Sequence, residues 1–260
     1  MKDDLDVFAY NRRAWDRQVR DGDRWTIPVE PEVIAAARRG DWSVVLTPSR
    51  PVPRDWFPED FEGVRVLALA CGGGQQGPVF AAAGAEVTVL DAAASQLAQD
   101  RAVATREGLS LRTVQGDMGD LSAFGDGSFD LVFHPVANLF VPEIRGVWKE
   151  ASRVLRRGGE LLAGFANPLY FLFDDEAFSR GELVVRYRIP YADTEQLDAS
   201  RLEALMADEQ PLCFGHTLED QIAGQLDAGL ALVGFYEDRW DDKIIDDRIA
   251  TFIATRACKA

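Results

Sequence analysis

Residues 66–91 read VLALACGGGQQGPVFAAAGAEVTVLD, and this stretch decides the fold. It opens on an apolar run of buried-strand length, and the glycines at 72–74 then let the backbone turn with positive φ and approach a ligand closely. Pro78 suits the first turn of a short helix. Residues 87–90 form a second apolar run. The segment predicts a strand–turn–helix–strand unit, with Asp91 placed to accept hydrogen bonds from ribose hydroxyls.

Short apolar runs continue to alternate with helical segments after this unit. Such alternation is typical of an open, largely parallel sheet with helices on both faces and right-handed crossovers. We therefore predict an α/β, doubly wound fold around a mainly parallel seven-stranded sheet. The predicted strands cover residues 64–69, 87–90, 111–115, 129–133, 160–165, 231–236 and 248–255, and the later helices cover residues 92–107, 142–155 and 217–228.

The two ends of the chain are expected to play different parts. Residues 1–60 are predicted to form a helical cover and connector, with an amphipathic helix over residues 4–20 and a second short helix over residues 32–39. Residues 61–260 are predicted to form the main domain. Within it, residues 166–212 are rich in Phe, Tyr and Asp and break the strand–helix rhythm, so we predict a lid-like insertion over the carboxyl edge of the sheet.

Composition excludes several classes of partner. The chain has 260 residues, 47% of them hydrophobic, which is enough for a substantial core without disulfides or metals. A net charge of −15 repels a phosphate backbone and an anionic membrane surface, so we expect neither nucleic acid nor membrane as a partner. Three cysteines in unrelated contexts and the lack of an apolar signal segment favour a cytoplasmic protein. Two distant histidines predict no metal site.

The glycine segment allows two interpretations. Residues 72–77 read GGGQQG and match the GxGxxG pattern of dinucleotide-binding folds, which keeps an NAD-dependent oxidoreductase as an alternative. However, only residues 78–83 separate Gly77 from Gly84, and these make fewer than two turns at ~3.6 residues per turn. The helix must therefore begin near residues 74–75. The loop then becomes residues 70–74, a turn that suits a smaller nucleoside with no pyrophosphate to hold.

With these landmarks in order, residues 64–165 resemble the class I S-adenosylmethionine-dependent methyltransferases, and most closely a bacterial subgroup acting on small molecules. In that resemblance the glycine loop binds the methionine part of the cofactor, Asp91 holds both ribose hydroxyls, and Asp117 in QGDM receives the adenine amino group. SFDLVF and LRRGGELL match strands four and five. The implied cofactor-binding residues are Ala70, Cys71, Gly72, Gly74, Gln76, Asp91, Ala92, Asp117, Met118 and His134.

Two positions depart from the family pattern. Ala68 stands where the family usually has an acidic residue, and Ala70 where it has a glycine, so a polar anchor for the methionine ammonium group is missing. Gln75, Gln76 or backbone carbonyls near His134 are our candidates for replacing it. The same departures keep a non-catalytic nucleoside-binding protein as a second alternative.

The resemblance implies methyl transfer from S-adenosylmethionine to a small-molecule acceptor, with S-adenosylhomocysteine as product. His134 directly follows strand four and is the candidate general base. Each key residue also has a purely structural alternative, because Asp91 suits a helix cap, Asp117 a turn and His134 a loop hydrogen bond. The aromatic residues of the N-terminal segment and the insertion are predicted to form a lid over the acceptor.

Overall fold

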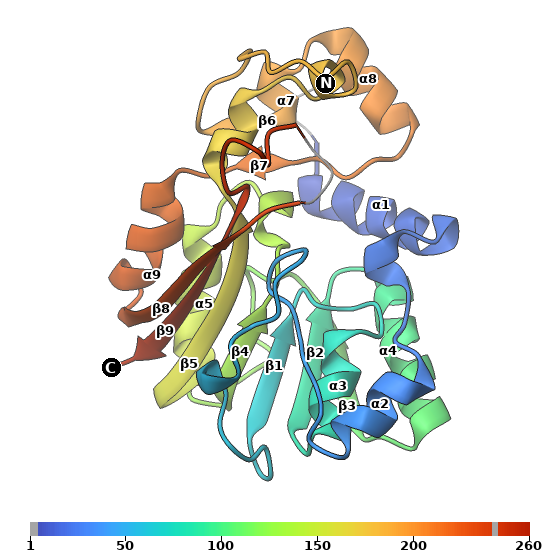
Figure 1. Cartoon of the computed structure of the whole chain (residues 1–260), viewed down its shortest axis with the longest axis vertical. Coiled ribbons are helices and arrows are strands. Elements are labelled where there is room, and N and C mark those ends of the chain that lie inside the picture. Colours follow the sequence, from blue (N-terminus) through green and yellow to red (C-terminus); the bar gives the residue numbers. More distant parts are fainter. Residues whose placement is uncertain (1–4, 241–243) are drawn as a thin grey trace.

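A seven-stranded sheet forms the middle layer of the computed structural model, which describes residues 5–240 and 244–260 (Figure 1). The strands of this sheet are β1 (Arg65–Leu69), β2 (Glu86–Asp91), β3 (Leu111–Gln115), β4 (Phe129–His134), β5 (Leu155–Ala166), β8 (Leu230–Asp238) and β9 (Phe252–Lys259). Their spatial order is β3-β2-β1-β4-β5-β9-β8. β1 to β5 are parallel, and β9 runs antiparallel to both of its neighbours. The predicted mainly parallel sheet of seven strands is confirmed.

Helices cover both faces of the sheet. They are α2 (Pro31–Ala37), α3 (Gln76–Ala82), α4 (Ala94–Glu107), α5 (Arg145–Val154) and α9 (Gly224–Asp227), the last preceded by the π-helical residues Glu219–Ala223. Successive residues of a strand point to opposite faces. Ala68 accordingly shares a core with Phe80 of α3, whereas Leu69 shares a separate core with Trp148 of α5. The doubly wound arrangement is therefore confirmed.

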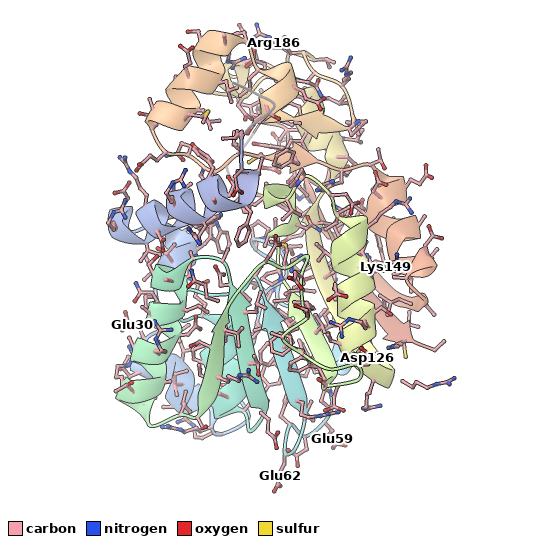
Figure 2. The ribbon with its side chains drawn as sticks, turned by 180° about the vertical axis from the view of Figure 1, so that it is seen from behind. Glu30, Glu59, Glu62, Asp126, Lys149 and Arg186 are labelled. Atoms are coloured by element: carbon pink, nitrogen blue, oxygen red, sulfur yellow. The ribbon has the colours of Figure 1, made fainter. Side chains whose placement is uncertain are left out.

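A cover of two separate segments, α1 (Val7–Asp21) and residues 167–215, lies beyond the carboxyl ends of the parallel strands (Figures 1 and 2). Figure 2 shows Arg186 at the far end of the cover and Glu59 and Glu62 at the opposite end of the molecule. The second segment contains Pro168–Leu172, α6 (Asp175–Phe178), β6 (Tyr191–Ala192), α7 (Asp193–Gln196), α8 (Ala199–Ala207) and β7 (Phe214–Gly215).

The two segments of the cover are joined by apolar and polar contacts. Their shared apolar cluster contains Tyr10, Ala14, Leu202, Leu212 and Phe214. The buried Asn11 amide donates to the carbonyls of Phe140 (2.8 Å) and Leu212 (3.0 Å), and its oxygen accepts the Leu212 N–H at 2.8 Å. Asp16 of α1 accepts the backbone N–H of Ser95 at 3.0 Å and also the Ser95 hydroxyl, so it caps α4.

Several predicted boundaries need correction. The first helix begins at Val7, and its predicted start, Asp4, lies outside the described residues. The last strand begins at Phe252 and not at residue 248, because Asp246 accepts the Thr251 hydroxyl at 2.8 Å and holds the preceding residues in a turn. β5 begins five residues before the predicted strand, where Leu155 pairs with β4.

The connecting segments complete the description. Short 3₁₀ turns cover Arg24–Thr26, Arg54–Trp56 and Asn138–Phe140. None of the helices in the described residues combines the length and the apolar character needed to cross a bilayer.

Candidate functional site

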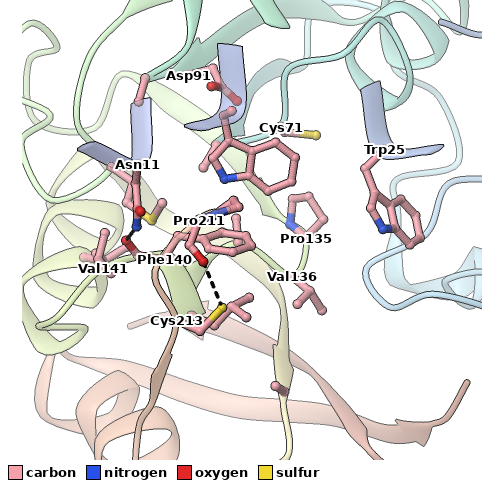
Figure 3. A pocket seen from close by; sticks show the side chains of 18 of the residues that line it. Asn11, Trp25, Cys71, Asp91, Pro135, Val136, Phe140, Val141, Pro211 and Cys213 are labelled. Atoms are coloured by element: carbon pink, nitrogen blue, oxygen red, sulfur yellow. Dashed lines mark hydrogen bonds between the residues drawn. The ribbon is translucent and has the colours of Figure 1, made fainter. Parts of the chain in front are cut away.

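A cavity of about 900 Å³ lies between the carboxyl ends of the central strands and the cover. Figure 3 shows Asp91 and Cys71 on one side of it, Cys213 with Pro211 on the other, and Phe140 between them. The position agrees with the general rule that open α/β sheets bind ligands outside the carboxyl ends of their strands. Its volume falls within the range of small-molecule sites, roughly 300–1,000 Å³.

The glycine loop, residues 70–75, forms the floor of the cavity. Ala70 adopts a left-handed conformation with φ of 48°, which a glycine would adopt without strain. Gly73 has φ of 110°, and a Cβ there would lie 2.7 Å from the Trp25 carbonyl oxygen. A Cβ at Gly72 would lie 2.7 Å from the Gln96 Cβ. The loop therefore needs glycine at both positions, and Gly72 lines the cavity.

Asp91 ends β2 and lines the cavity. Its Oδ2 accepts the Gly72 N–H at 3.0 Å, and its Oδ1 accepts the Ala93 N–H at 2.9 Å. Burial raises the pKa of this carboxyl to about 6, against the lowering effect of the two N–H donors. The residue thus caps the following turn and, at the same time, presents a carboxyl group to the cavity.

Most of the other predicted cofactor residues also line the cavity: Ala70, Cys71, Gly72, Gln76, Ala92, Asp117 and Met118. Asp117 accepts the Gly119 N–H at 2.8 Å, as expected for a turn residue, and remains exposed to the cavity. Burial raises the pKa of the Cys71 thiol, so this group stays protonated. Gly74 is not among the described lining residues, because a Cβ there would point toward Pro28 and Val103.

His134 does not reach the cavity, so its placement argues against both roles expected for it. The side chain is fully buried, lies edge-on to Trp148, and holds its Nδ1 2.9 Å from the Leu69 carbonyl oxygen. Burial lowers the pKa of His134 to about 4. The ring therefore stays neutral and packs on the α5 side of the sheet, where it is hydrogen-bonded to the end of β1 and not to a loop.

The candidates for replacing the missing polar anchor are engaged elsewhere. The Gln75 amide donates to the carbonyls of Arg24 and Ile27, both at 2.9 Å, and so holds the N-terminal connector against the loop. Gln76 accepts the Val45 N–H at 3.3 Å through its side-chain oxygen. Ala68 is fully buried in the middle of the sheet. Both glutamines thus combine a bond to the connector with a place on the cavity wall.

Sequence reasoning missed Asp100, which supports the loop from beneath. Its side chain on α4 is fully buried, and its Oδ2 accepts the Gly73 N–H at 3.1 Å. Its Oδ1 has no hydrogen-bond partner among the described residues, and burial raises the pKa to about 8. The signal was available, because Asp100 shares the buried face of α4 with Leu97 and Val103 at helical spacing. A carboxyl group among the apolar residues of a helix face indicates that the group has a specific role in the buried structure.

Comparisons with known proteins agree with this geometry. A family model described as a methyltransferase domain matches residues 67–163. The uncharacterized methyltransferase YbaJ of Bacillus subtilis (strain 168) is 53% identical over 253 residues, which cover 97% of this chain and 98% of that protein. The sterol 24-C-methyltransferase ERG6B of Gibberella zeae is 39% identical over 100 residues, covering 37% of this chain and 26% of that protein.

The fold is shared with solved structures as well. The structure of an S-adenosylmethionine-dependent methyltransferase from Mesorhizobium loti matches with a TM-score of 0.60 at 20% identity, over 79% of this chain and 95% of that chain. The chain therefore belongs to the class I S-adenosylmethionine-dependent methyltransferases, as its sequence predicts. The family relationship gives no support to an NAD-dependent oxidoreductase or to a non-catalytic nucleoside-binding protein.

Proposed function

We propose that this chain binds S-adenosylmethionine along the carboxyl ends of β1, β2 and β3 and transfers its methyl group to a small-molecule acceptor held under the cover. The observation that carries this proposal is the continuity of one cavity from Asp91 and Asp117 to the aromatic residues of the insertion. Both ligands need such a shared space, because direct transfer requires the acceptor atom and the methyl group to meet in line.

The residues of the floor fit the cofactor. Gly72 and Asp91 both line the cavity, and Asp91 would offer its carboxyl group to the ribose hydroxyls. Asp117 is placed to receive the adenine amino group, with Ala92 and Met118 beside the ring. When bound, the cofactor supplies an electrophilic methyl group on a sulfonium.

The chain's own contribution is positioning and the exclusion of water. The cover closes the cavity with apolar side chains, so an acceptor inside it loses solvent and is held against the floor. His134 is fully buried outside the cavity lining, so we assign it no part in proton transfer. Alignment and desolvation are sufficient for a good nucleophile.

Calorimetry with S-adenosylmethionine, S-adenosylhomocysteine and NAD tests this proposal. We expect both sulfur compounds to bind and NAD to bind far more weakly. Asp91→Ala should weaken S-adenosylhomocysteine binding by about 10- to 150-fold, since a hydrogen bond to a charged group contributes about 1.5–3 kcal/mol. Exposed Asp55 provides the matched control, Asp55→Ala, which should bind as the wild type does. Preferential binding of NAD, or equal effects of the two substitutions, would refute the proposal.

A further inference from the structure

The part of the cavity that faces the cover is built from aromatic side chains. Those that matter here are Phe8, Trp15, Phe140, Tyr170, Phe171 and Tyr191. They pack against one another, with Phe171 stacked on Tyr191 at a centroid distance of 5.4 Å and Trp15 edge-on to Phe140 at 5.0 Å. The faces of aromatic rings attract cations as well as apolar groups.

Two carboxylates from the insertion stand in this aromatic wall. Asp193 is only 5% exposed, and it accepts the Tyr191 hydroxyl and the Cys213 N–H, both at 2.6 Å. Asp175 accepts the Tyr170 hydroxyl at 3.1 Å. Both carboxylates line the cavity. Burial raises the pKa of Asp193, and the charge of Asp175 adds to this effect.

No cationic side chain among the described residues forms an ion pair with the Asp193 carboxylate. Among the described residues that line the cavity, six are acidic and one, Arg12, is basic. The guanidinium groups of Arg186 and Arg201 pair with Asp174 at 2.9 and 2.8 Å. In residues 5–240 and 244–260, no cationic side chain lies within 4.0 Å of the Asp193 carboxylate. A buried carboxylate is costly unless a cation accompanies it.

We propose that the methyl acceptor is an amine with an aromatic body, whose ammonium group is held by Asp193 with the support of Asp175 while its body packs on the rings of the cover. This inference rests on the proposed function, because it assigns the acceptor of the same site. A charge-assisted hydrogen bond and ring contacts would act together on such a molecule. The ammonium group serves as the binding handle, since a protonated nitrogen has no lone pair. The methyl group would go to a second nucleophilic atom on the aromatic body, whose electron pair forms the new bond to carbon as the sulfonium–methyl bond breaks, and a proton on that atom would leave to solvent.

Three indole compounds of matched shape test the proposal: tryptamine, the neutral tryptophol and the anionic indole-3-propionate. Binding to the full chain is measured by calorimetry with S-adenosylhomocysteine present. We expect tryptamine to bind at least about tenfold more tightly than tryptophol, and indole-3-propionate to bind most weakly. Equal affinity for tryptamine and tryptophol would overturn the proposal.

Two substitutions locate the effect. Asp193→Asn should abolish the preference for tryptamine and leave S-adenosylhomocysteine affinity unchanged, whereas the exposed Asp208→Asn on the same insertion should alter neither. Tyr191→Phe keeps the carboxylate and removes one of its donors, so tryptamine should bind at least as tightly as before. If both Asp193→Asn and Tyr191→Phe weaken all three compounds equally, Asp193 is only structural and the proposal is wrong. Amine preference without S-adenosylhomocysteine binding would instead refute the proposed cofactor.

Discussion

Replacing Asp100 by asparagine should make the protein more stable, and increasingly so as the pH rises. Burial raises the pKa of the Asp100 carboxyl to about 8 in the folded protein, whereas the ordinary pKa of an aspartate is 3.8. Between these values the folded protein keeps a proton that the unfolded chain releases. The folded state then binds more protons than the unfolded state, so stability falls with rising pH by up to about 1.4 kcal/mol per pH unit. Between about pH 6.5 and 8 the wild type should lose about 1.5 kcal/mol of its free energy of unfolding through this group, and Asp100→Asn should not.

The design isolates this carboxyl. The asparagine oxygen can still accept the Gly73 N–H, so the loop contact is retained. His134 and His216, whose pKa values burial lowers, favour stability as the pH rises toward about 6.5, but they act equally in both proteins and cancel in the difference. Urea unfolding followed by tryptophan fluorescence at the two pH values gives the free energies, with exposed Asp55→Asn as the control. A stability difference between wild type and Asp100→Asn that is independent of pH would refute the reasoning.

Three further substitutions test the packing of the core, the contact between the two segments of the cover, and the role of His134. Gly77→Ala should destabilise the protein by about 1–3 kcal/mol, because its Cβ would lie 2.7 Å from the Val89 Cγ2. Calorimetric melting measures this loss of stability. A second substitution, Val89→Ala, should restore part of it. Asn11→Leu leaves the Leu212 N–H without its acceptor, so we expect a loss of about 1–3 kcal/mol and faster amide exchange in the insertion, and unchanged exchange would contradict this. His134→Asn should keep S-adenosylhomocysteine affinity within about threefold, and a larger loss would mean that the residue acts on the cofactor.

The parts of the fold that could be predicted are those set by local pattern. The boundaries of β3 agree with the prediction because its five residues, LRTVQ, lie between Gly108 and Gly116, so local sequence decides where the strand begins and ends. The start of β9 could not be predicted, since the turn before it depends on the contact of Asp246 with Thr251 and on a hydrogen bond from the Trp240 N–H to the same carboxylate.

The candidate site shows the same division. Gly72 and the strand-end carboxyl of Asp91 follow from the chain's local order, and the structure brings them together at the cavity. The side chains of a strand alternate between the two faces of the sheet, so a shift of one residue at the strand end decides whether a side chain meets the cavity or α5. His134 points to α5, and the sequence alone does not reveal this. Asp100 could not be assigned from the sequence, because its carboxyl lies on the buried face of α4 and meets the Gly73 N–H only in the folded chain.

The contact between Asp16 of α1 and Ser95 of α4 joins the cover of the cavity to the helix beneath its floor. Asp16 belongs to the roof of the cavity, and the helix it caps carries Asp100 under the floor. A displacement of α1 would therefore also release the hydrogen bonds of Ser95 in the first turn of α4, contacts of a kind that contribute about 1 kcal/mol.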